Sequence, residues 1–320
     1  KPCQCFRIYI NWIPKLMLNK TLRIGTRESQ LALWQSQNVA NYFEKEGASS
    51  TLIKIKSDGD IDLVKPLYAM GVQGIFTKTL DMALLQNRID IAVHSLKDVP
   101  TQLPKGIIIA AVLSRGSVSD VLLKKTDANN QNSNSTIGTG SLRRKAQWLN
   151  KYPDYEVENL RGNVQTRIEK LNQSDWHGAI FAKAGLERME LLGNDYQVLD
   201  WMIPAPAQGA IAVVCREEDL EIKALFKNIH CETTSICVGI ERSFLNILEG
   251  GCTAPIGAIA KFEGKKITFK AGLFSTDGMQ AVTTEKTVDL NSIAELAQST
   301  VDELLSRGGK AIMEEINNNR

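Results

Sequence analysis

The chain has 320 residues, of which 43% are hydrophobic and 23% charged, so it is long enough for two or three domains with their own cores. Its 38 Lys and Arg barely exceed its 36 Asp and Glu. This near-neutral balance provides no global positive field, which argues against a nucleic-acid binder. No stretch approaches the roughly 18 uninterrupted apolar residues of a membrane span, so a membrane protein is not expected.

Six cysteines are scattered through the chain without the spacing of a disulfide framework, which favours a reducing compartment and predicts a cytoplasmic protein. Cys3 with Cys5, and His230-Cys231 with Cys237, lack a second ligand pair at zinc-finger spacing, so no metal site is predicted. No glycine-rich fingerprint for NAD or ATP is present either. No long apolar stripe requires a partner chain, and we expect a monomer.

Residues 1–16 contain no acidic residue and precede Met17, and we expect them to form an N-terminal extension outside the folded domains. From Leu22 onward, short β-branched runs alternate with helical patterns, which predicts the α/β class with parallel or mixed sheets. The first strands and helices are expected at residues 22–25, 29–45, 52–56, 76–86, 89–93, 107–112 and 120–123. The Asn- and Ser-rich residues 127–135 predict a solvated surface insertion.

A second α/β set is predicted from Thr136, with elements at residues 136–138, 142–150, 156–160, 164–171, 179–182 and 197–199. A further strand is expected at residues 211–215. Beyond His230 the pattern changes to one long helix, three antiparallel strands and a C-terminal helix. The strands are expected at 256–262, 267–274 and 281–288, and the last helix at 293–305. These elements predict a separate α+β domain.

Arginines recur at or just after the predicted strand-to-helix junctions of both sets: Arg27, Arg143, Arg144, Arg161, Arg167 and Arg188. At such junctions free backbone N–H groups favour an anion, and guanidinium adds paired hydrogen bonds to carboxylate or phosphate. A cation at a helix N-terminus otherwise costs about 0.3–1 kcal/mol, so the repetition indicates a compensating anion. For any single arginine, a solvated cation or a structural ion pair is the alternative. The expected ligand therefore carries several negative groups.

Asp98 follows the buried strand at 89–93, and ligands of α/β sheets bind beyond the carboxyl ends of strands. Basic neighbours would keep this carboxylate ionised, so Asp98 is the natural general acid or base, or the stabiliser of a cation. A turn aspartate before Val99-Pro100 is the alternative. His94, inside the strand, is expected to be a hydrogen-bonded structural histidine.

Cys252 lies in the run EGGCTAP at residues 249–255, where two glycines and a proline predict an exposed turn before an apolar strand. Glycines allow the backbone to bring the sulfur close to a ligand, whereas a structural cysteine usually lies inside a hydrophobic element. The pattern favours an attachment or nucleophile site. An unreactive loop thiol is the alternative, because spacing does not report thiolate character.

From Leu22 to near the C-terminus the chain resembles the porphobilinogen deaminase family. The resemblance rests on TRESQLALW at 26–34, VHSLKDVP at 93–100, GSLRR at 140–144, LRGNV at 160–164, PAQG at 206–209 and EGGC at 249–252. It implies two α/β domains of the periplasmic-binding-protein type and a smaller α+β C-terminal domain with a three-stranded antiparallel sheet. The domain ranges would be 17–114 with 210–229, then 118–206, then 232–320 carrying the cysteine.

The activity that the resemblance implies is a transferase reaction of haem-type tetrapyrrole biosynthesis. Four porphobilinogen molecules are joined head to tail with loss of ammonia, and the product hydroxymethylbilane is released by hydrolysis. A dipyrromethane cofactor would be held by Cys252 through a thioether and would prime the chain. Asp98 would assist the loss of ammonia, stabilise cationic pyrrole species and move protons. The acetate and propionate of each pyrrole would explain the arginines.

The resemblance also implies a role for each polar side chain of these motifs. The residues expected to face carboxylates of the cofactor are Lys97, Thr139, Ser141, Arg143 and Arg144. The residues expected to bind the incoming porphobilinogen are Arg27, Ser29, Arg161 and Arg188. Arg167 is expected to serve both.

One segment departs from the family pattern. Many members carry lysines in the loop that corresponds to residues 65–75, but Ala69 and Gln73 stand at the aligned positions here. Gly71 and Gly74 still predict a pliable lid. The rival interpretation is a non-catalytic two-domain anion-binding protein, which would explain the arginines but not Asp98 or the Cys252 loop.

Overall fold

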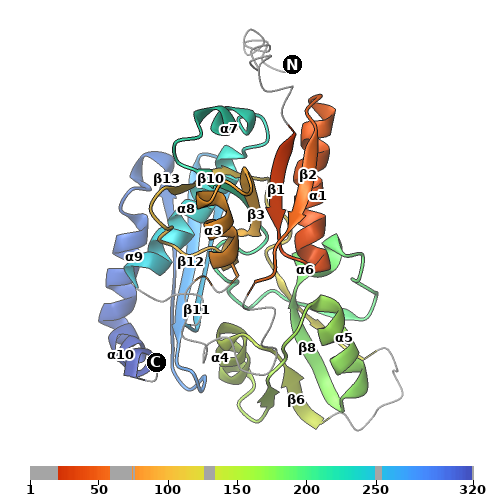
Figure 1. Ribbon diagram of the computed structural model, residues 1–320. Coiled ribbons are helices and arrows are strands. Elements are labelled where there is room, and N and C mark those ends of the chain that lie inside the picture. Colours follow the sequence, from red (N-terminus) through yellow and green to blue (C-terminus); the bar gives the residue numbers. More distant parts are fainter. Residues whose placement is uncertain (1–20, 58–73, 75, 126–133, 249–253, 319–320) are drawn as a thin grey trace, which may run out of the picture.

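The computed structural model describes residues 21–57, 74, 76–125, 134–248 and 254–318. The expected extension at 1–16, Cys252, and almost all of the expected lid and surface insertion lie outside the described residues. The chain forms two five-stranded sheets and one three-stranded sheet. Figure 1 shows the first sheet above the second, with the C-terminal helices and strands along one side.

The first sheet has the strand order β2 (Ser50–Lys54), β1 (Leu22–Thr26), β3 (Ile91–Ser95), β10 (Ile211–Arg216), β4 (Ile107–Val112). β1 is parallel to β2 and β3, whereas β10 is antiparallel to both of its neighbours. Successive residues of β3 face opposite sides, so Val93 packs with helix α1 (Gln30–Lys45) and Ala92 with α3 (Lys78–Leu85). The short α7 (Leu220–Leu225) packs on the α1 side.

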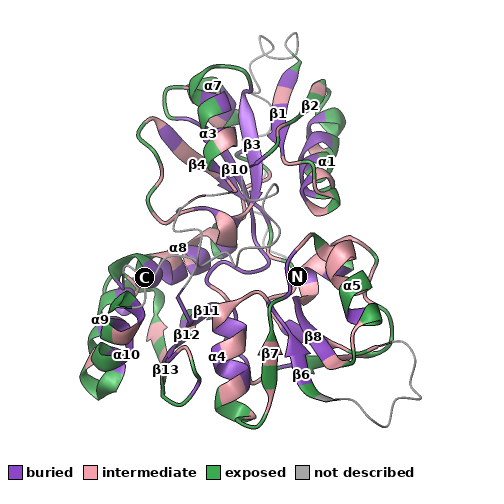
Figure 2. Ribbon diagram, turned by 60° about the horizontal axis from the view of Figure 1, so that its bottom comes forward, coloured by how far each residue is buried: buried purple, intermediate pink, exposed green. Residues whose placement is uncertain are grey.

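The second sheet repeats this arrangement in the order β7 (Glu156–Glu158), β6 (Asn134–Gly138), β8 (Trp176–Ala182), β5 (Asp120–Leu123), β9 (Tyr196–Leu199). β6 is parallel to β7 and β8, and β5 is antiparallel to β8 and β9. The helices of this half are α4 (Leu142–Lys151), α5 (Val164–Gln173) and α6 (Lys183–Arg188). The two halves therefore share one topology, and buried strands form the centre of each (Figure 2).

Each sheet receives its antiparallel strand from the other half of the fold. β5 follows β4 in the chain but joins the second sheet, and β10 follows β9 but joins the first. The chain consequently crosses between the sheets twice, at residues 113–119 and 200–210. The crossings are hydrogen-bonded to each other, since Gly116 N donates to Gly209 O at 3.1 Å. Gly209 has φ +85°, and a Cβ there would lie 2.7 Å from Ser117 O, so the contact requires glycine.

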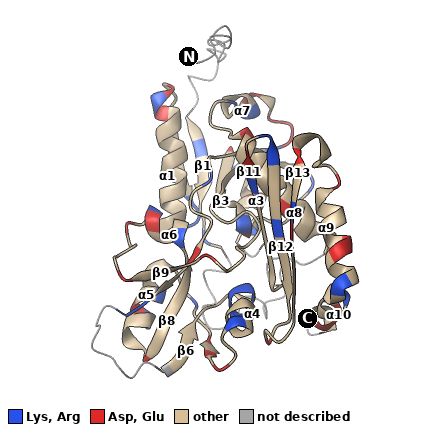
Figure 3. Ribbon diagram, turned by 180° about the vertical axis from the view of Figure 1, so that it is seen from behind, with Lys and Arg blue, Asp and Glu red and all other residues tan. Residues whose placement is uncertain are grey.

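The C-terminal unit packs helices against one face of an antiparallel sheet. Its elements are α8 (Glu232–Ile247), β11 (Ile256–Glu263), β12 (Lys266–Phe274), β13 (Ala281–Asp289), α9 (Leu296–Leu304) and α10 (Lys310–Asn318). Phe244 of α8 meets Phe269 of β12 in its core. Charged residues occur along these strands (Figure 3). Lys270 of β12 and Glu285 of β13 form an ion pair at 3.5 Å. α10 was not expected, and Gly308 (φ +106°) separates it from α9.

The predicted fold class, two α/β units and a smaller α+β unit with a three-stranded antiparallel sheet, is confirmed. The exchange of β5 and β10 supports the division at 17–114 with 210–229, 118–206 and 232–320, which we retain as a proposal. Among the described helices, none combines the length and the apolar character that crossing a bilayer requires.

Candidate active site

Asp98 lies at the carboxyl end of β3, on a single 3-10 turn, Leu96–Asp98. Leu96 N donates to Ala210 O at 3.0 Å, and Val99 N closes the turn onto Leu96 O at 3.2 Å. The turn is thus fixed to the second crossing where it enters β10. Asp98 itself is half-buried.

The pKa of Arg167 on α5 shows which charged groups lie close to this side chain. Its pKa is lowered to about 10, first by burial and then by other cations. The cations that lower it are Arg144, Arg161 and Arg27, and the charge that raises it is Asp98. Its Nε donates to Gly162 O at 2.8 Å, which fixes the side chain above the start of α5. The arginines of both halves therefore lie within electrostatic reach of one another and of Asp98.

Lys97 belongs to the same group of charges. Its pKa is lowered to about 8, mainly by burial and by Arg144 and Arg143, although Asp98 and Asp120 raise it. Its Nζ donates to Gln208 Oε1 of the second crossing at 3.5 Å. Among the described residues, the cations identified through Arg167 and Lys97 are Arg27, Lys97, Arg143, Arg144, Arg161 and Arg167, against the carboxylates Asp98 and Asp120. This excess of positive charge suits a ligand with several carboxylates.

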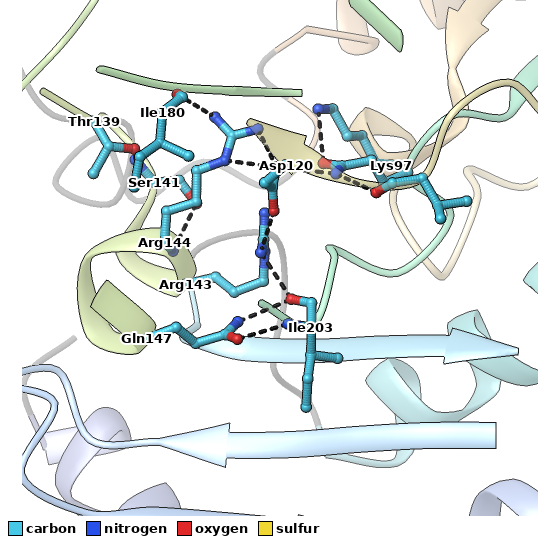
Figure 4. A network of polar contacts seen from close by, with 11 residues as sticks. Lys97, Asp120, Thr139, Ser141, Arg143, Arg144, Gln147, Ile180 and Ile203 are labelled. Atoms are coloured by element: carbon cyan, nitrogen blue, oxygen red, sulfur yellow. Dashed lines mark hydrogen bonds and ion pairs between the residues drawn. The ribbon is translucent and has the colours of Figure 1, made fainter. Parts of the chain in front are cut away.

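Asp120 is the internal counter-ion of two of these arginines (Figure 4). Its Oδ1 accepts from Arg144 Nε and Nη2 at 3.0 and 2.8 Å, and its Oδ2 lies 2.8 Å from Arg143 Nη1. Burial alone would raise the pKa of Asp120, but the two guanidinium groups hold it well below its usual range. Asp120 was not among the site residues predicted from the sequence. Its only local signal is an acidic side chain at the start of an apolar strand.

Arg143 and Arg144 also bind backbone carbonyls. Arg143 Nη1 donates to Ile203 O at 2.8 Å, and Arg144 Nη1 donates to Ile180 O at 3.0 Å. Gln208 completes the network, because its Nε2 donates to Asp120 Oδ1 at 3.0 Å. A guanidinium has five N–H groups, and these contacts use only some of them. The two arginines are therefore held rigidly and retain donors for further carboxylate oxygens.

Thr139 and Ser141 shape the loop that leads into α4. Ser141 caps the helix, with its Oγ accepting from Arg144 N at 3.5 Å, and Thr139 Oγ1 accepts from Ser141 N at 3.3 Å. Between them, a Cβ on Gly140 would lie 2.6 Å from Leu160 O. Glycine thus allows this loop to touch the segment that carries Arg161, which joins two of the predicted motifs.

Replacing Gly140 with alanine is expected to force these two loops apart. The obstacle is a backbone carbonyl that cannot rotate away, so we expect a loss of about 1–3 kcal/mol and a lower Tm. Gly239→Ala in the middle of α8 is the matched control. Outside α8 itself, the described part of the chain places no atom within 4 Å of its Cβ position, so the variant should leave stability unchanged or raise it by up to about 1 kcal/mol. Equal Tm changes for the two variants would contradict the argument.

Arg27 and Ser29 lie beyond β1, as the sequence predicts. The Arg27 guanidinium is 4.1 Å from the ring centroid of Phe76, which holds it over an aromatic face. Ser29 caps α1, with its Oγ accepting from Ala32 N at 3.4 Å. His94 is buried, and burial together with the charge of Arg27 lowers its pKa to about 4, so it is neutral near pH 7.

Arg188 has a different location from the other predicted arginines. Its Nη2 donates to Gly209 O at 2.6 Å, and its guanidinium lies 5.8 Å from the Trp34 ring centroid on α1. It therefore sits at the crossing between the sheets. The sequence predicted that Arg188 would bind the same ligand as Arg27 and Arg161, but it gave no sign of this contact with the crossing. Cys252 lies outside the described residues.

Residues 22–224 match the family model "Porphobilinogen deaminase, dipyromethane cofactor binding domain", and residues 235–306 match "Porphobilinogen deaminase, C-terminal domain". The porphobilinogen deaminase of Desulforamulus reducens is 40% identical over 301 residues, which cover 92% of this chain and 97% of the relative. The chloroplastic porphobilinogen deaminase of Oryza sativa subsp. japonica is 40% identical over 92% of this chain and 86% of its own.

Among solved structures, the chain is similar to the methionine-binding protein MetQ, with a TM-score of 0.43 and 11% identity. The similarity covers 69% of this chain and 94% of the MetQ chain. The sequence matches extend over both α/β units and the C-terminal unit. They include the segments that bring Asp98 and the arginines together. The chain belongs to the porphobilinogen deaminase family.

Proposed function

We propose that this chain condenses four porphobilinogen molecules head to tail, with loss of ammonia, and releases hydroxymethylbilane by hydrolysis. The observation that carries the proposal is the group of basic side chains whose charges act together with the half-buried carboxylate of Asp98. Each porphobilinogen unit carries an acetate and a propionate. Charge-assisted hydrogen bonds contribute about 1.5–3 kcal/mol each, so fixed guanidinium groups can hold such dicarboxylates out of water.

The residues present fit a dipyrromethane cofactor, whose side arms are carboxylates. Arg143 and Arg144 are held rigidly by Asp120 and by backbone carbonyls. Lys97 is close enough to both guanidinium groups for their charges to lower its pKa. Together with Thr139, Ser141 and Arg167, these side chains would bind the cofactor carboxylates. When bound, the cofactor supplies the covalent primer on which the pyrrole chain is extended. Cys252 is the proposed point of attachment, because in the sequence its thiol follows two glycines and precedes the strand β11.

Arg27, Ser29, Arg161 and Arg188 are the proposed ligands of incoming porphobilinogen. Arg27 comes from the first half of the fold and Arg161 from the second, so both halves would hold the substrate. Arg188 would act from the crossing, where its Nη2 already binds Gly209 O. Binding from two sides fixes the substrate aminomethyl group near Asp98 and lowers the entropic cost of the reaction.

Asp98 is the proposed catalytic residue. As ammonia leaves the aminomethyl carbon, positive charge develops on the pyrrole, and a fixed carboxylate stabilises that charge. The surrounding arginines hold the substrate but would oppose the same charge, so an acidic group is required among them. The carboxylate can also accept the proton that the pyrrole α-carbon loses after the new carbon–carbon bond forms.

The mass of the intact purified protein tests the proposed function. We expect a mass above that of the polypeptide by one dipyrromethane, with the increment on the peptide that contains Cys252. The same sample should consume porphobilinogen and release ammonia. An unmodified mass, together with no turnover after incubation with porphobilinogen, would instead identify the chain as a non-catalytic anion-binding protein.

We further propose that the enzyme is a monomer that works in the cytoplasm. The described cysteines Cys215, Cys231 and Cys237 are free thiols, which agrees with a reducing compartment. Light scattering across a range of protein concentrations should give the monomer mass of 35.4 kDa plus the cofactor. A mass that doubles with concentration would refute the monomer.

A further inference from the structure

One face of α8 supports the segment that carries Asp98. Val238, Arg242 and Asn246 recur every four residues and therefore lie one above another along the helix. Val238 packs in the same buried cluster as Leu96 and Val99. Asn246 Oδ1 accepts from Gln102 Nε2 at 3.4 Å. The whole segment from Leu96 to Gln102 thus lies along this stripe of α8.

Arg242 makes the polar contacts at the centre of this stripe. Its Nη1 donates to Val99 O at 2.8 Å, and its Nη2 donates to Pro100 O at 2.6 Å and reaches Thr101 O at 3.5 Å. Pro100 has no N–H, so this stretch cannot form a regular strand ladder. A planar guanidinium instead binds consecutive carbonyls with several donors in a fixed geometry, which an ammonium cannot do.

The opposite end of the Asp98 turn is also fixed. Leu96 N donates to Ala210 O at 3.0 Å, and the contact from Val99 N to Leu96 O closes the turn at 3.2 Å. Asp98 therefore lies between an anchor on the second crossing and an anchor on α8. Because Arg242 binds the three carbonyls directly after Asp98, we expect loss of its guanidinium to loosen this side of the turn.

We infer that Arg242 is a positioning residue for Asp98, and that α8 fixes the carboxylate relative to the C-terminal unit. α8 ends at Ile247, five residues before Cys252 in the chain, so one helix connects the support of Asp98 to the segment with the proposed attachment site. The inference rests on the proposed function. It assigns a role in the reaction to a side chain that does not itself contact the substrate.

The test compares Arg242→Gln and Arg242→Lys with the wild-type holoenzyme. Cofactor loading is measured by intact mass, and kcat is divided by the loaded fraction, so that partly folded or unloaded protein does not count. We expect Arg242→Gln to lower kcat about 10- to 100-fold, because displacing a catalytic group by about 1 Å costs that much. KM for porphobilinogen should change less than about twofold, since the arginines that bind substrate are untouched. Arg242→Lys should recover only part of kcat.

Chemical rescue separates positioning from a purely structural role. Adding ethylguanidinium to Arg242→Ala should restore part of kcat, whereas ethylammonium at the same concentration should not. Two control variants should keep cofactor loading, kcat and KM at wild-type values. These are Ser243→Ala, at an exposed position of the same helix, and Arg307→Gln, since Arg307 binds Glu303 and Thr283 O elsewhere in the C-terminal unit.

Three outcomes would overturn the inference. These are a normal kcat in Arg242→Gln, a loss of rate explained fully by lost cofactor, and a rescue that ethylammonium achieves equally well. An inactive wild-type enzyme would be a different result, because it would reject the proposed function itself. The wild-type measurement therefore comes first, and each variant is read against it.

Discussion

Replacing Asp98 with asparagine is expected to lower turnover of porphobilinogen by about 10²- to 10⁴-fold while the protein stays folded and loaded with cofactor. Asparagine has nearly the same shape but offers no negative charge to a developing cation and no basic oxygen for a proton. The cations that hold carboxylates would remain in place, so KM should change much less than kcat. Steady-state kinetics on protein of known cofactor content measures both.

Two further variants sharpen this prediction. Asp98→Glu keeps the charge but moves it by one methylene, so it should retain more activity than Asp98→Asn and less than wild type. Asp154→Asn, an exposed carboxylate in the second half of the fold, should behave as wild type. Near-normal turnover of Asp98→Asn would refute the role assigned to Asp98.

Replacing Asp120 with asparagine is expected to be the most destabilising of these changes. The carboxylate is fully buried between Arg143 and Arg144, and removing it leaves two guanidinium groups without their counter-ion. Breaking a buried ion pair in this way typically costs about 3–5 kcal/mol. Urea denaturation near pH 7 should therefore show a lower free energy of unfolding, and thermal melting a lower Tm.

Glu303→Gln is the matched control for Asp120. Glu303 also has two cationic partners, Lys286 at 3.1 Å and Arg307 at 2.9 Å, but these contacts lie at the surface. Exposed ion pairs are screened by water and contribute little, so this variant should change Tm far less than Asp120→Asn. If both variants shifted Tm equally, burial would not be the cause.

The effect of Asp120 should also depend on pH. Its folded-state pKa is lowered, so its contribution is fully present above the unfolded value of about 3.9 and is lost as the pH falls toward the folded value. The stability difference between wild type and Asp120→Asn should hence be constant from pH 7 to about pH 5. It should shrink below about pH 4. A difference that is unchanged at pH 3 would contradict the assignment of the charge to Asp120.

The local features of the site could be predicted from the sequence because their causes lie within a few residues. Ser141 caps α4 through a contact three residues away, and the arginines follow strands by chain order alone. Periodicity likewise gave most strands and helices of both halves, though not α7, with bounds that differ from the structure by a few residues. Asp98 was identified because it follows the buried strand β3 directly.

The partners of these residues could not be predicted, because they are distant in the chain. Asp120 meets Arg144 across 24 positions and Gln208 across 88, and Arg242 meets Val99 across 143. No periodic pattern of one strand or helix encodes such contacts. Arg188 shows the consequence, since nothing in its sequence surroundings indicates that its guanidinium binds Gly209 O.

The sequence by itself determined the α/β class, the C-terminal α+β unit, and the chemical types present: basic groups for an anionic ligand, one candidate carboxylate and one candidate thiol. Only the tertiary structure decided that β5 and β10 exchange between the sheets, and that the paired crossings carry Gln208 into the group of charges around Asp120. Short-range patterns specify which face of an element is buried. Which buried faces meet is decided by packing and by the pairing of buried charges across the whole chain.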